Sequence, residues 1–369
     1  MKKHQLLLLF ISLTLLISCT KDSSPKEGYL ISGSLTGISD GYAYLQQPSP
    51  EGLITLDSVE ISDGKYNFEG SVDMPQVYYL KINNSNYYIT FFLENSSINI
   101  TSHIDSLYKS KITGSVCQLE LDEFQEKILP YKNKLKELYK AYYKAEKSND
   151  EELMASIDTE YEQVHSEQIM KMKDYAVTNP TSVVASYISA RYLSNELDYS
   201  SLDSIYQTFK VNLENDRYLK KLEERLEILE KVAIGKPAVD IIQNDTSHVT
   251  VALSSLKGKN VLIEFWASWC TTCKSENRRL KKIYKNYQNK GFEVFAVSLD
   301  NDFTQWTEAV NASELPWINV SDLKGWQSET RKLYGVIKTP HNLLLNKDGI
   351  IIAKDLYGEE LEKHLDRLN

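Results

Sequence analysis

The chain has 369 residues, of which 42% are hydrophobic and 25% charged, a composition typical of a soluble globular protein with two or three domains. Its formal net charge of -9 argues against nucleic acid as a partner, and no basic cluster interleaved with aromatic residues suggests otherwise. With only four cysteines, the chain is not a scaffold held together by disulfides.

The chain begins with a segment typical of an export signal. Lysines at positions 2 and 3 precede an apolar stretch, residues 6–17, which is short for a transmembrane helix. The segment ends Leu-Ile-Ser before Cys19, which resembles a bacterial lipobox with Cys19 as the lipidated residue. We therefore expect a lipoprotein signal peptide (1–18), a flexible polar tether (19–27) and a lipid anchor at the periplasmic side of the bacterial cell envelope, with the outer membrane as the expected location. The alternative is an ordinary signal peptide with an incidental cysteine.

Residues 28–115 alternate between apolar and polar positions, with turn residues such as Asp63-Gly64 at short intervals. This pattern predicts a small antiparallel β-sandwich without a visible catalytic constellation. The expected strands are 29–35, 42–46, 53–61, 66–72, 77–83, 87–93 and 98–102.

Residues 116–233 have helical periodicity and many lysines and glutamates. We expect an exposed helical bundle or arm, with long helical segments at 135–145, 151–175 and 218–231. Because no heptad pattern is sustained, we expect a monomer and not a coiled-coil dimer. Cys117 lies among apolar residues, so we expect a small buried side chain there; a regulatory thiol is the alternative.

Residues 234–369 alternate strands with helices, which predicts an α/β domain with a parallel core. The expected strands are 249–253, 261–266, 292–298, 343–345 and 350–354, and the expected helices are 274–288, 303–312 and 358–368. The fold class is therefore multidomain: a β-sandwich, a helical region and an α/β domain.

Cys270 and Cys273 lie where the apolar strand 261–266 gives way to an amphipathic helix. Unpaired N–H groups and the positive end of the helix dipole stabilise an anion at such a junction, which lowers a thiol pKa. Two intervening residues allow the pair to close a small disulfide ring. We expect this redox-active disulfide in place of a cofactor, and no metal site, because there is a single CxxC and the six histidines lack ligand spacing.

The C-terminal third resembles the thioredoxin superfamily, and within it the TlpA/ResA-type exported thiol–disulfide oxidoreductases. The residues that carry the resemblance are the run FWASWCTTCK at 265–274, the lead-in LKGK at 256–259 and KTP at 338–340. The preceding two-thirds resembles, in layout, the uncharacterised β-plus-helical extension of many bacterial lipoproteins.

The resemblance implies roles for individual residues. Cys270 would attack a substrate disulfide and Cys273 would resolve the mixed disulfide. Glu264 would be the buried proton acceptor for Cys273, the alternative being a solvated or lysine-paired acid at a strand edge. Pro340 would follow a cis peptide bond that exposes the backbone of Thr339 to a substrate peptide; the alternative is a trans proline in a loop.

Trp269 is expected to shield the dithiol and to offer an apolar surface to a peptide, whereas Trp266 is expected in the core. One departure from the family pattern is Thr271-Thr272 where Gly-Pro is usual, which leaves the reduction potential and the direction of exchange open.

The sequence therefore predicts a membrane-tethered oxidoreductase that exchanges disulfides with exported proteins, foremost as a reductant recycled by a membrane thiol donor. Oxidant and isomerase roles remain alternatives within this chemistry. Outside it, the alternatives are a thiol peroxidase and a lipoprotein adaptor that uses the thioredoxin fold only as a support.

Overall fold

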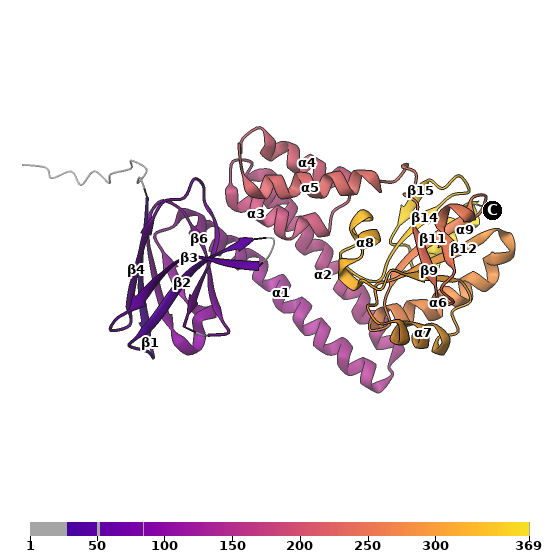
Figure 1. Ribbon diagram of the computed structural model, residues 1–369, viewed down its shortest axis with the longest axis horizontal. Coiled ribbons are helices and arrows are strands. Elements are labelled where there is room, and N and C mark those ends of the chain that lie inside the picture. Colours follow the sequence, from indigo (N-terminus) through magenta and orange to yellow (C-terminus); the bar gives the residue numbers. More distant parts are fainter. Residues whose placement is uncertain (1–27, 50–51, 84, 369) are drawn as a thin grey trace, which may run out of the picture. The chain divides into compact units, whose positions relative to one another are not determined.

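The computed structural model describes residues 28–49, 52–83 and 85–368 (Figure 1). The expected signal peptide, the tether and Cys19 lie outside these residues. The described chain divides into two compact units with the boundary between Asp122 and Glu123. None of the helices in the described ranges combines the length and the apolarity that a membrane span requires.

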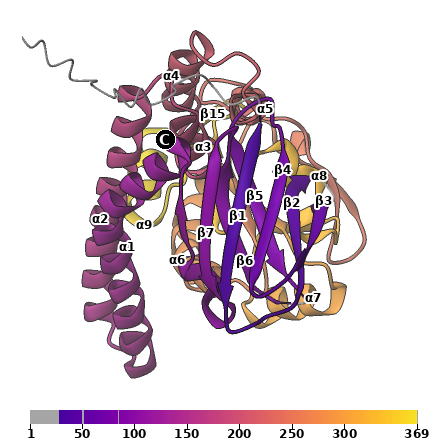
Figure 2. The ribbon, with the colours of Figure 1, turned by 90° about the vertical axis from the view of Figure 1, so that its left-hand side faces the viewer.

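The first unit contains two four-stranded sheets, ordered β4-β1-β7-β8 and β3-β2-β5-β6 (Figure 2). Alternate residues of the strands point into one shared core, as in β1, where Ile31 and Leu35 are buried. The predicted sandwich is confirmed, except that β1 and β7 pair in parallel. The strands are β1 (Tyr29–Thr36), β2 (Gly41–Ser49), β3 (Gly52–Ile61), β4 (Lys65–Gly70), β5 (Gln76–Ile82), β6 (Tyr88–Leu93), β7 (Ser97–His103) and β8 (Lys111–Thr113).

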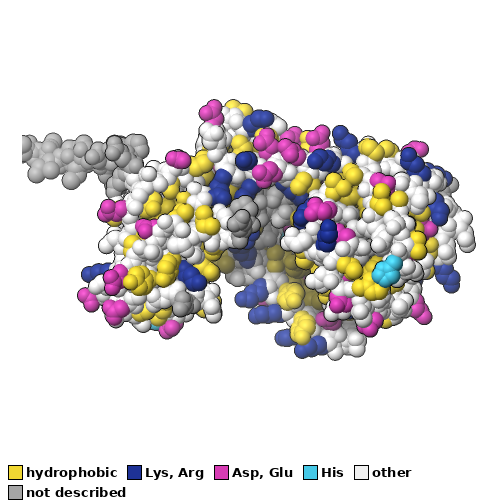
Figure 3. All heavy atoms as spheres, in the orientation of Figure 1, with side chains coloured by type: hydrophobic (Ala, Val, Ile, Leu, Met, Phe, Trp, Pro, Cys, Tyr) yellow, Lys and Arg dark blue, Asp and Glu magenta, His cyan; other side chains and the backbone are white. Residues whose placement is uncertain are grey.

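The helical region predicted from the sequence is confirmed. Asp150, Ser182, Asp198 and Asp216 cap α2 to α5 by accepting hydrogen bonds from main-chain N–H groups of the first turns. Acidic and basic side chains are interspersed over α4 and α5 on the face seen in Figure 3. The helices are α1 (Val116–Ser148), which spans the unit boundary, α2 (Glu151–Thr178), α3 (Val183–Arg191), α4 (Tyr199–Lys210) and α5 (Arg217–Lys231).

Cys117, in the first turn of α1, is partly buried and not fully buried as expected. Burial, and secondarily the carboxylate of Glu94, raise the pKa of its thiol. Because the thiolate is the reactive form, this environment disfavours the alternative of a regulatory thiol.

The second unit contains a seven-stranded sheet with the order β10-β9-β13-β12-β11-β14-β15. Strands β11, β12 and β13 are parallel, which confirms the predicted parallel core, and β9, β14 and β15 join antiparallel. All seven residues of β11 are buried: strands pair with both of its edges, and side chains from both of its faces belong to the hydrophobic core. The strands are β9 (Ile242–Asp245), β10 (Thr250–Ala252), β11 (Asn260–Trp266), β12 (Phe292–Ser298), β13 (Ile318–Ser321), β14 (His341–Leu345) and β15 (Ile351–Lys354).

The helices of this unit that follow the linker at 232–241 are α6 (Thr271–Tyr287), α7 (Phe303–Ala312), α8 (Glu329–Leu333) and α9 (Gly358–Leu368). The predictions for α7 and α9 match these bounds. Strands β9 and β13 and helix α8 were not predicted. Each is only four or five residues long, too short for a clear periodic pattern, and β13 pairs with strands that lie far away in the sequence.

Candidate active site

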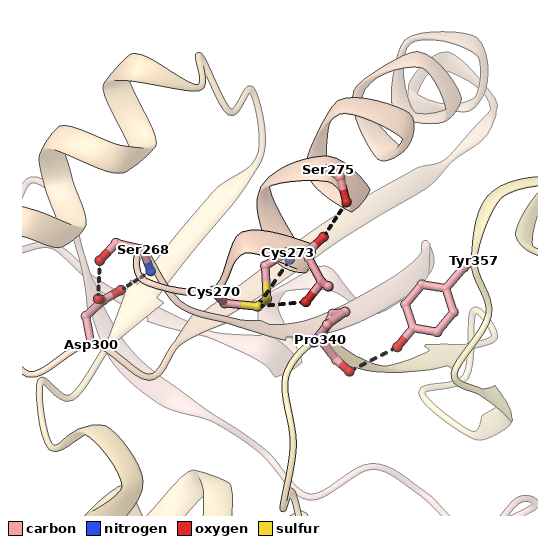
Figure 4. Close-up of a disulfide and its surroundings, with 8 residues drawn as sticks. Ser268, Cys270, Cys273, Ser275, Asp300, Pro340 and Tyr357 are labelled. Atoms are coloured by element: carbon pink, nitrogen blue, oxygen red, sulfur yellow. Dashed lines mark hydrogen bonds between the residues drawn. A yellow bond between two sulfur atoms is a disulfide. The ribbon is translucent and has the colours of Figure 1, made fainter. Parts of the chain in front are cut away.

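The dithiol lies between β11 and α6, as predicted, and is closed as a disulfide with a Cα–Cα distance of 5.2 Å (Figure 4). Cys270 is the N-cap residue of α6, and its Sγ accepts a hydrogen bond from the backbone N–H of Cys273 at 3.1 Å. Cys270 retains 6% of its surface, whereas Cys273 has 0%. Only Cys270 is therefore within reach of another molecule, and the helix N-terminus favours its thiolate.

A buried carboxylate holds the turn that leads to Cys270. Asp300, just beyond β12, accepts hydrogen bonds from the backbone N–H of Ser268 at 3.0 Å and from its hydroxyl at 2.5 Å (Figure 4). It also accepts one from the hydroxyl of Ser298 at 2.6 Å. Since β11 and β12 are parallel neighbours with Trp266 opposite Ser298, both strands end at the same edge and bring these groups together. Sequence reasoning missed Asp300; an acid directly after an apolar strand was the available signal.

The peptide bond between Thr339 and Pro340 is cis, which confirms the prediction, and Pro340 lies beside the dithiol in Figure 4. The hydroxyl of Tyr357 donates a hydrogen bond to the carbonyl of Pro340 at 3.1 Å. Within the described residues, the backbone of Thr339 has no hydrogen-bond partner. An unpaired backbone edge next to a disulfide is suited to pair with an extended peptide.

Glu264 lies in the middle of β11 and is 1% exposed. Burial, and then the negative charge of Glu276, raise its pKa well above the usual range, while a hydrogen bond with Asn342 opposes this shift. Glu276 is in the second turn of α6, three residues after Cys273. The alternative of a solvated or lysine-paired acid at a strand edge is excluded by this burial.

Glu276 is also buried. Burial raises its pKa, and the guanidinium of Arg279, with Nη1 3.6 Å from Oε2, partly offsets the shift. Two carboxyl groups whose pKa values are raised by burial, Glu264 and Glu276, thus belong to β11 and α6, the two elements that flank the dithiol.

Trp269 is half exposed, and Trp266 is buried in the core as expected. The ring of Trp269 lies 6.1 Å, between centroids, from the ring of Trp326, which is 40% exposed. The guanidinium carbon of Arg331 lies 5.7 Å from the centre of the Trp326 ring. Sequence reasoning missed Trp326, because nothing in the local pattern indicates that its loop lies beside Trp269.

Comparisons with known proteins agree with this geometry. Residues 234–354 match the AhpC/TSA family, and residues 29–121 match a domain of unknown function, DUF4369. ResA thiol–disulfide oxidoreductases of Bacillus thuringiensis and Geobacillus thermodenitrificans are 32% and 28% identical over 137 and 140 residues, each 37% of this chain and 77% and 79% of theirs.

Two solved structures are also similar. The C-terminal domain of a putative thiol-disulfide oxidoreductase from Bacteroides thetaiotaomicron is 39% identical, with 37% of this chain and 97% of that chain covered and a TM-score of 0.36. A thiol-disulfide oxidoreductase from Bacteroides fragilis is 34% identical, with 36% and 100% covered and a TM-score of 0.35.

The dithiol at the strand-to-helix junction, the cis-proline and the parallel sheet define an oxidoreductase domain of the thioredoxin fold. The chain belongs to the thiol–disulfide oxidoreductases related to ResA.

Proposed function

We propose that this protein is tethered to a membrane through Cys19 and reduces disulfides of exported proteins. The observation that carries the proposal is the asymmetry of the pair: Cys270 is reachable and caps α6, whereas Cys273 is fully buried behind it. The first sulfur is placed to attack another molecule, and the second is placed to attack only the first.

In the reduced protein, the thiolate of Cys270 attacks a substrate disulfide. A bond forms between its Sγ and one substrate sulfur, the substrate disulfide breaks, and the other substrate sulfur leaves as a thiolate. Cys273 then attacks Sγ of Cys270, which closes the protein disulfide and releases the second substrate sulfur. The dithiol thereby loses two electrons and two protons, and the substrate gains two electrons and becomes two thiols.

Glu264 would serve the second step. Cys273 needs to lose a proton before it attacks, and no solvent reaches its side chain. A carboxyl group whose pKa is raised toward neutrality is a suitable acceptor, because proton transfer is most efficient when the acceptor pKa lies near the working pH.

The exposed surface around the dithiol is suited to a peptide substrate. The backbone edge of Thr339 offers strand-like pairing, and the adjoining tryptophans, Trp269 and Trp326, offer apolar contact. A membrane thiol donor would return the protein to its reduced form, and the lipid on Cys19 would keep the protein at the periplasmic face of the envelope.

The test combines trapping of the mixed disulfide with measurement of the reduction potential of the dithiol. In reduced protein, Cys273→Ala should accumulate a mixed disulfide on Cys270 with exported proteins, identified by mass spectrometry, whereas Cys270→Ser should trap none. A dithiol potential near that of thioredoxin, about -270 mV, supports a reductant, and a potential near -120 mV would exclude that role. Labelling with a radioactive fatty acid that is lost in Cys19→Ala tests the tether.

A further inference from the structure

The segment that leads to the cis-proline is held by the helical part of the second unit. Arg225, on α5, donates from Nη1 to the carbonyl of Gly335 at 2.8 Å and from Nε to the carbonyl of Ser194 at 3.0 Å. Ser194 belongs to a short helical turn (Leu193–Asn195) between α3 and α4. One guanidinium therefore links the helical region to the loop that enters Pro340.

The backbone of this loop fits closely against α5. Gly335 has a φ of +65°, a conformation that side chains disfavour, and a Cβ there would lie 2.8 Å from Nη1 of Arg225 and 3.0 Å from Cγ2 of Ile228. Glycine is thus required both by the backbone conformation and by the approach of the helix. Such a contact leaves the loop little freedom to move independently of α5.

Two further contacts fix the residues between Gly335 and the cis bond. Nη1 of Arg331 donates to the carbonyl of Val336 at 2.9 Å. Nζ of Lys338 lies 3.8 Å from Oε2 of Glu196, which follows the helical turn that contains Ser194. An exposed ion pair of this kind contributes little by itself, so the hydrogen bonds of the two guanidinium groups restrain the segment more strongly than the ion pair does.

The guanidinium of Arg225 is also in a costly environment. Burial, and then the like charge of Arg331, lower its pKa, so the charge is partly desolvated beside another cation. Two satisfied carbonyl acceptors on separate segments offset this cost. Burial of this charge does not by itself stabilise the packing of α5, but its two hydrogen bonds fix the position of the loop at Gly335.

We propose that helix α5 supports the substrate-binding site, because Arg225 fixes the loop that presents the unpaired backbone of Thr339 to a peptide. The inference rests on the proposed reduction of protein disulfides and assigns to α5 a role that the comparisons leave open. Arg225 is a positioning residue, since it acts through Gly335 and does not face the dithiol chemistry.

The experiment uses the full chain and four variants. Arg225→Met removes both hydrogen bonds, Arg225→Lys keeps the charge but not the forked donors, and Glu196→Gln removes the outer ion pair. Lys220→Met is the matched control, because Lys220 is exposed on the same helix and its side chain contacts no partner among the described residues. Kinetics with insulin and with a small aromatic disulfide are compared with amide exchange at residues 336–339.

In Arg225→Met we expect KM for insulin to rise on the order of tenfold, with kcat, the dithiol potential and the rate with the small disulfide within about twofold of the wild type. Amides at 336–339 should exchange roughly tenfold faster. Arg225→Lys should raise KM for insulin and speed amide exchange at 336–339 by smaller factors. This variant replaces Arg225→Met in the test if the methionine variant does not fold. Glu196→Gln should change KM by less than about threefold, and Lys220→Met should match the wild type.

Unchanged exchange at 336–339 in both Arg225 variants would overturn the inference, and so would faster exchange with an unchanged KM for insulin. Failure of the wild type to reduce insulin would contradict the proposed function instead. The exchange comparison would then still decide whether Arg225 holds the loop.

Discussion

The carboxylate of Asp300 accepts two hydrogen bonds from Ser268, one from the backbone N–H at 3.0 Å and one from the hydroxyl at 2.5 Å. Ser268 stands two residues before Cys270, and the main-chain carbonyl of Asp300 accepts a hydrogen bond from the N–H of Gly325, next to Trp326. Through these hydrogen bonds, the buried Asp300 connects the loop that contains Cys270 with the loop that contains Trp326.

Asp300→Asn is therefore expected to destabilise the protein by about 2 kcal/mol, because hydrogen bonds to a buried carboxylate are stronger than those to a neutral amide. It should also change the alkylation rate of reduced Cys270. Urea unfolding and iodoacetamide kinetics measure the two effects. Asp302→Asn is the control: Asp302 caps α7 by accepting from the N–H of Gln305, and asparagine caps equally well. Equal stability of the two variants would contradict the role of Asp300.

The buried Glu264 predicts a particular dependence of stability on pH. Because its pKa is raised above the ordinary 4.5, the folded protein keeps a proton that the unfolded chain has released, and stability falls as pH rises through this window. Glu264→Gln removes this loss. We expect the variant to gain stability relative to the wild type as the pH rises above the ordinary carboxyl value of 4.5, measured by urea unfolding at several pH values.

Glu276→Gln is the comparison for that experiment, since the pKa of Glu276 is raised as well and its effect has the same sign. A constant difference between wild type and Glu264→Gln across this pH range would show that Glu264 does not titrate as proposed.

The same residue is expected to matter for the second chemical step. Glu264→Gln should slow the attack of Cys273 on the mixed disulfide by roughly a hundredfold, because proton transfer by a positioned carboxylate contributes a factor of this order. The alkylation rate of Cys270 should change much less. Quenched-flow measurement of the mixed disulfide tests this expectation, and an unchanged lifetime would remove Glu264 from the mechanism.

The pair of exposed tryptophans predicts weaker substrate binding when either ring is lost. Trp326→Ala should raise KM for a protein disulfide by about three- to tenfold, the range that corresponds to one aromatic contact. Ile242→Ala, which trims another exposed apolar side chain of the same unit, should have no effect. Steady-state reduction of insulin compares them, and equal KM values would argue against a contact between substrate and Trp326.

The fit of α5 against Gly335 predicts a difference between two glycine substitutions. Gly335→Ala and Gly349→Ala both place a side chain at positive φ, but a Cβ at Gly349 meets nothing within 4 Å. Gly349→Ala should cost about 1 kcal/mol, and Gly335→Ala about 2 kcal/mol more, because Arg225 needs to move. Equal losses in urea unfolding would indicate that the helix does not press on this loop.

The parts of the fold that could be predicted are those encoded by neighbouring residues. Local patterns identified the buried strand β11, the cysteine pair at the start of α6 and the helical periodicity of α5. They were sufficient to predict that the dithiol lies at a strand-to-helix junction. The cis bond at Pro340 followed from the family resemblance and not from the residues themselves.

The parts that could not be predicted depend on contacts between distant segments. Asp300 contacts Ser268, 32 residues away in the sequence, and Arg225 contacts Gly335, 110 residues away. Neither Asp300 nor Arg225 belongs to a recognisable motif. Strand β13 was missed for the same reason, because its four residues are stabilised by β9 and β12 on either side. Sequence reasoning located the reacting groups but not the groups that position them.

The account depends most directly on the ionisation of Cys270 in the reduced protein. The pH dependence of its alkylation by iodoacetamide, measured in Cys273→Ala, gives the thiol pKa. The helix N-terminus predicts a thiol pKa below that of an ordinary exposed cysteine. A value at or above about 8.5, that of an ordinary exposed cysteine, would contradict the proposal that this sulfur is the nucleophile.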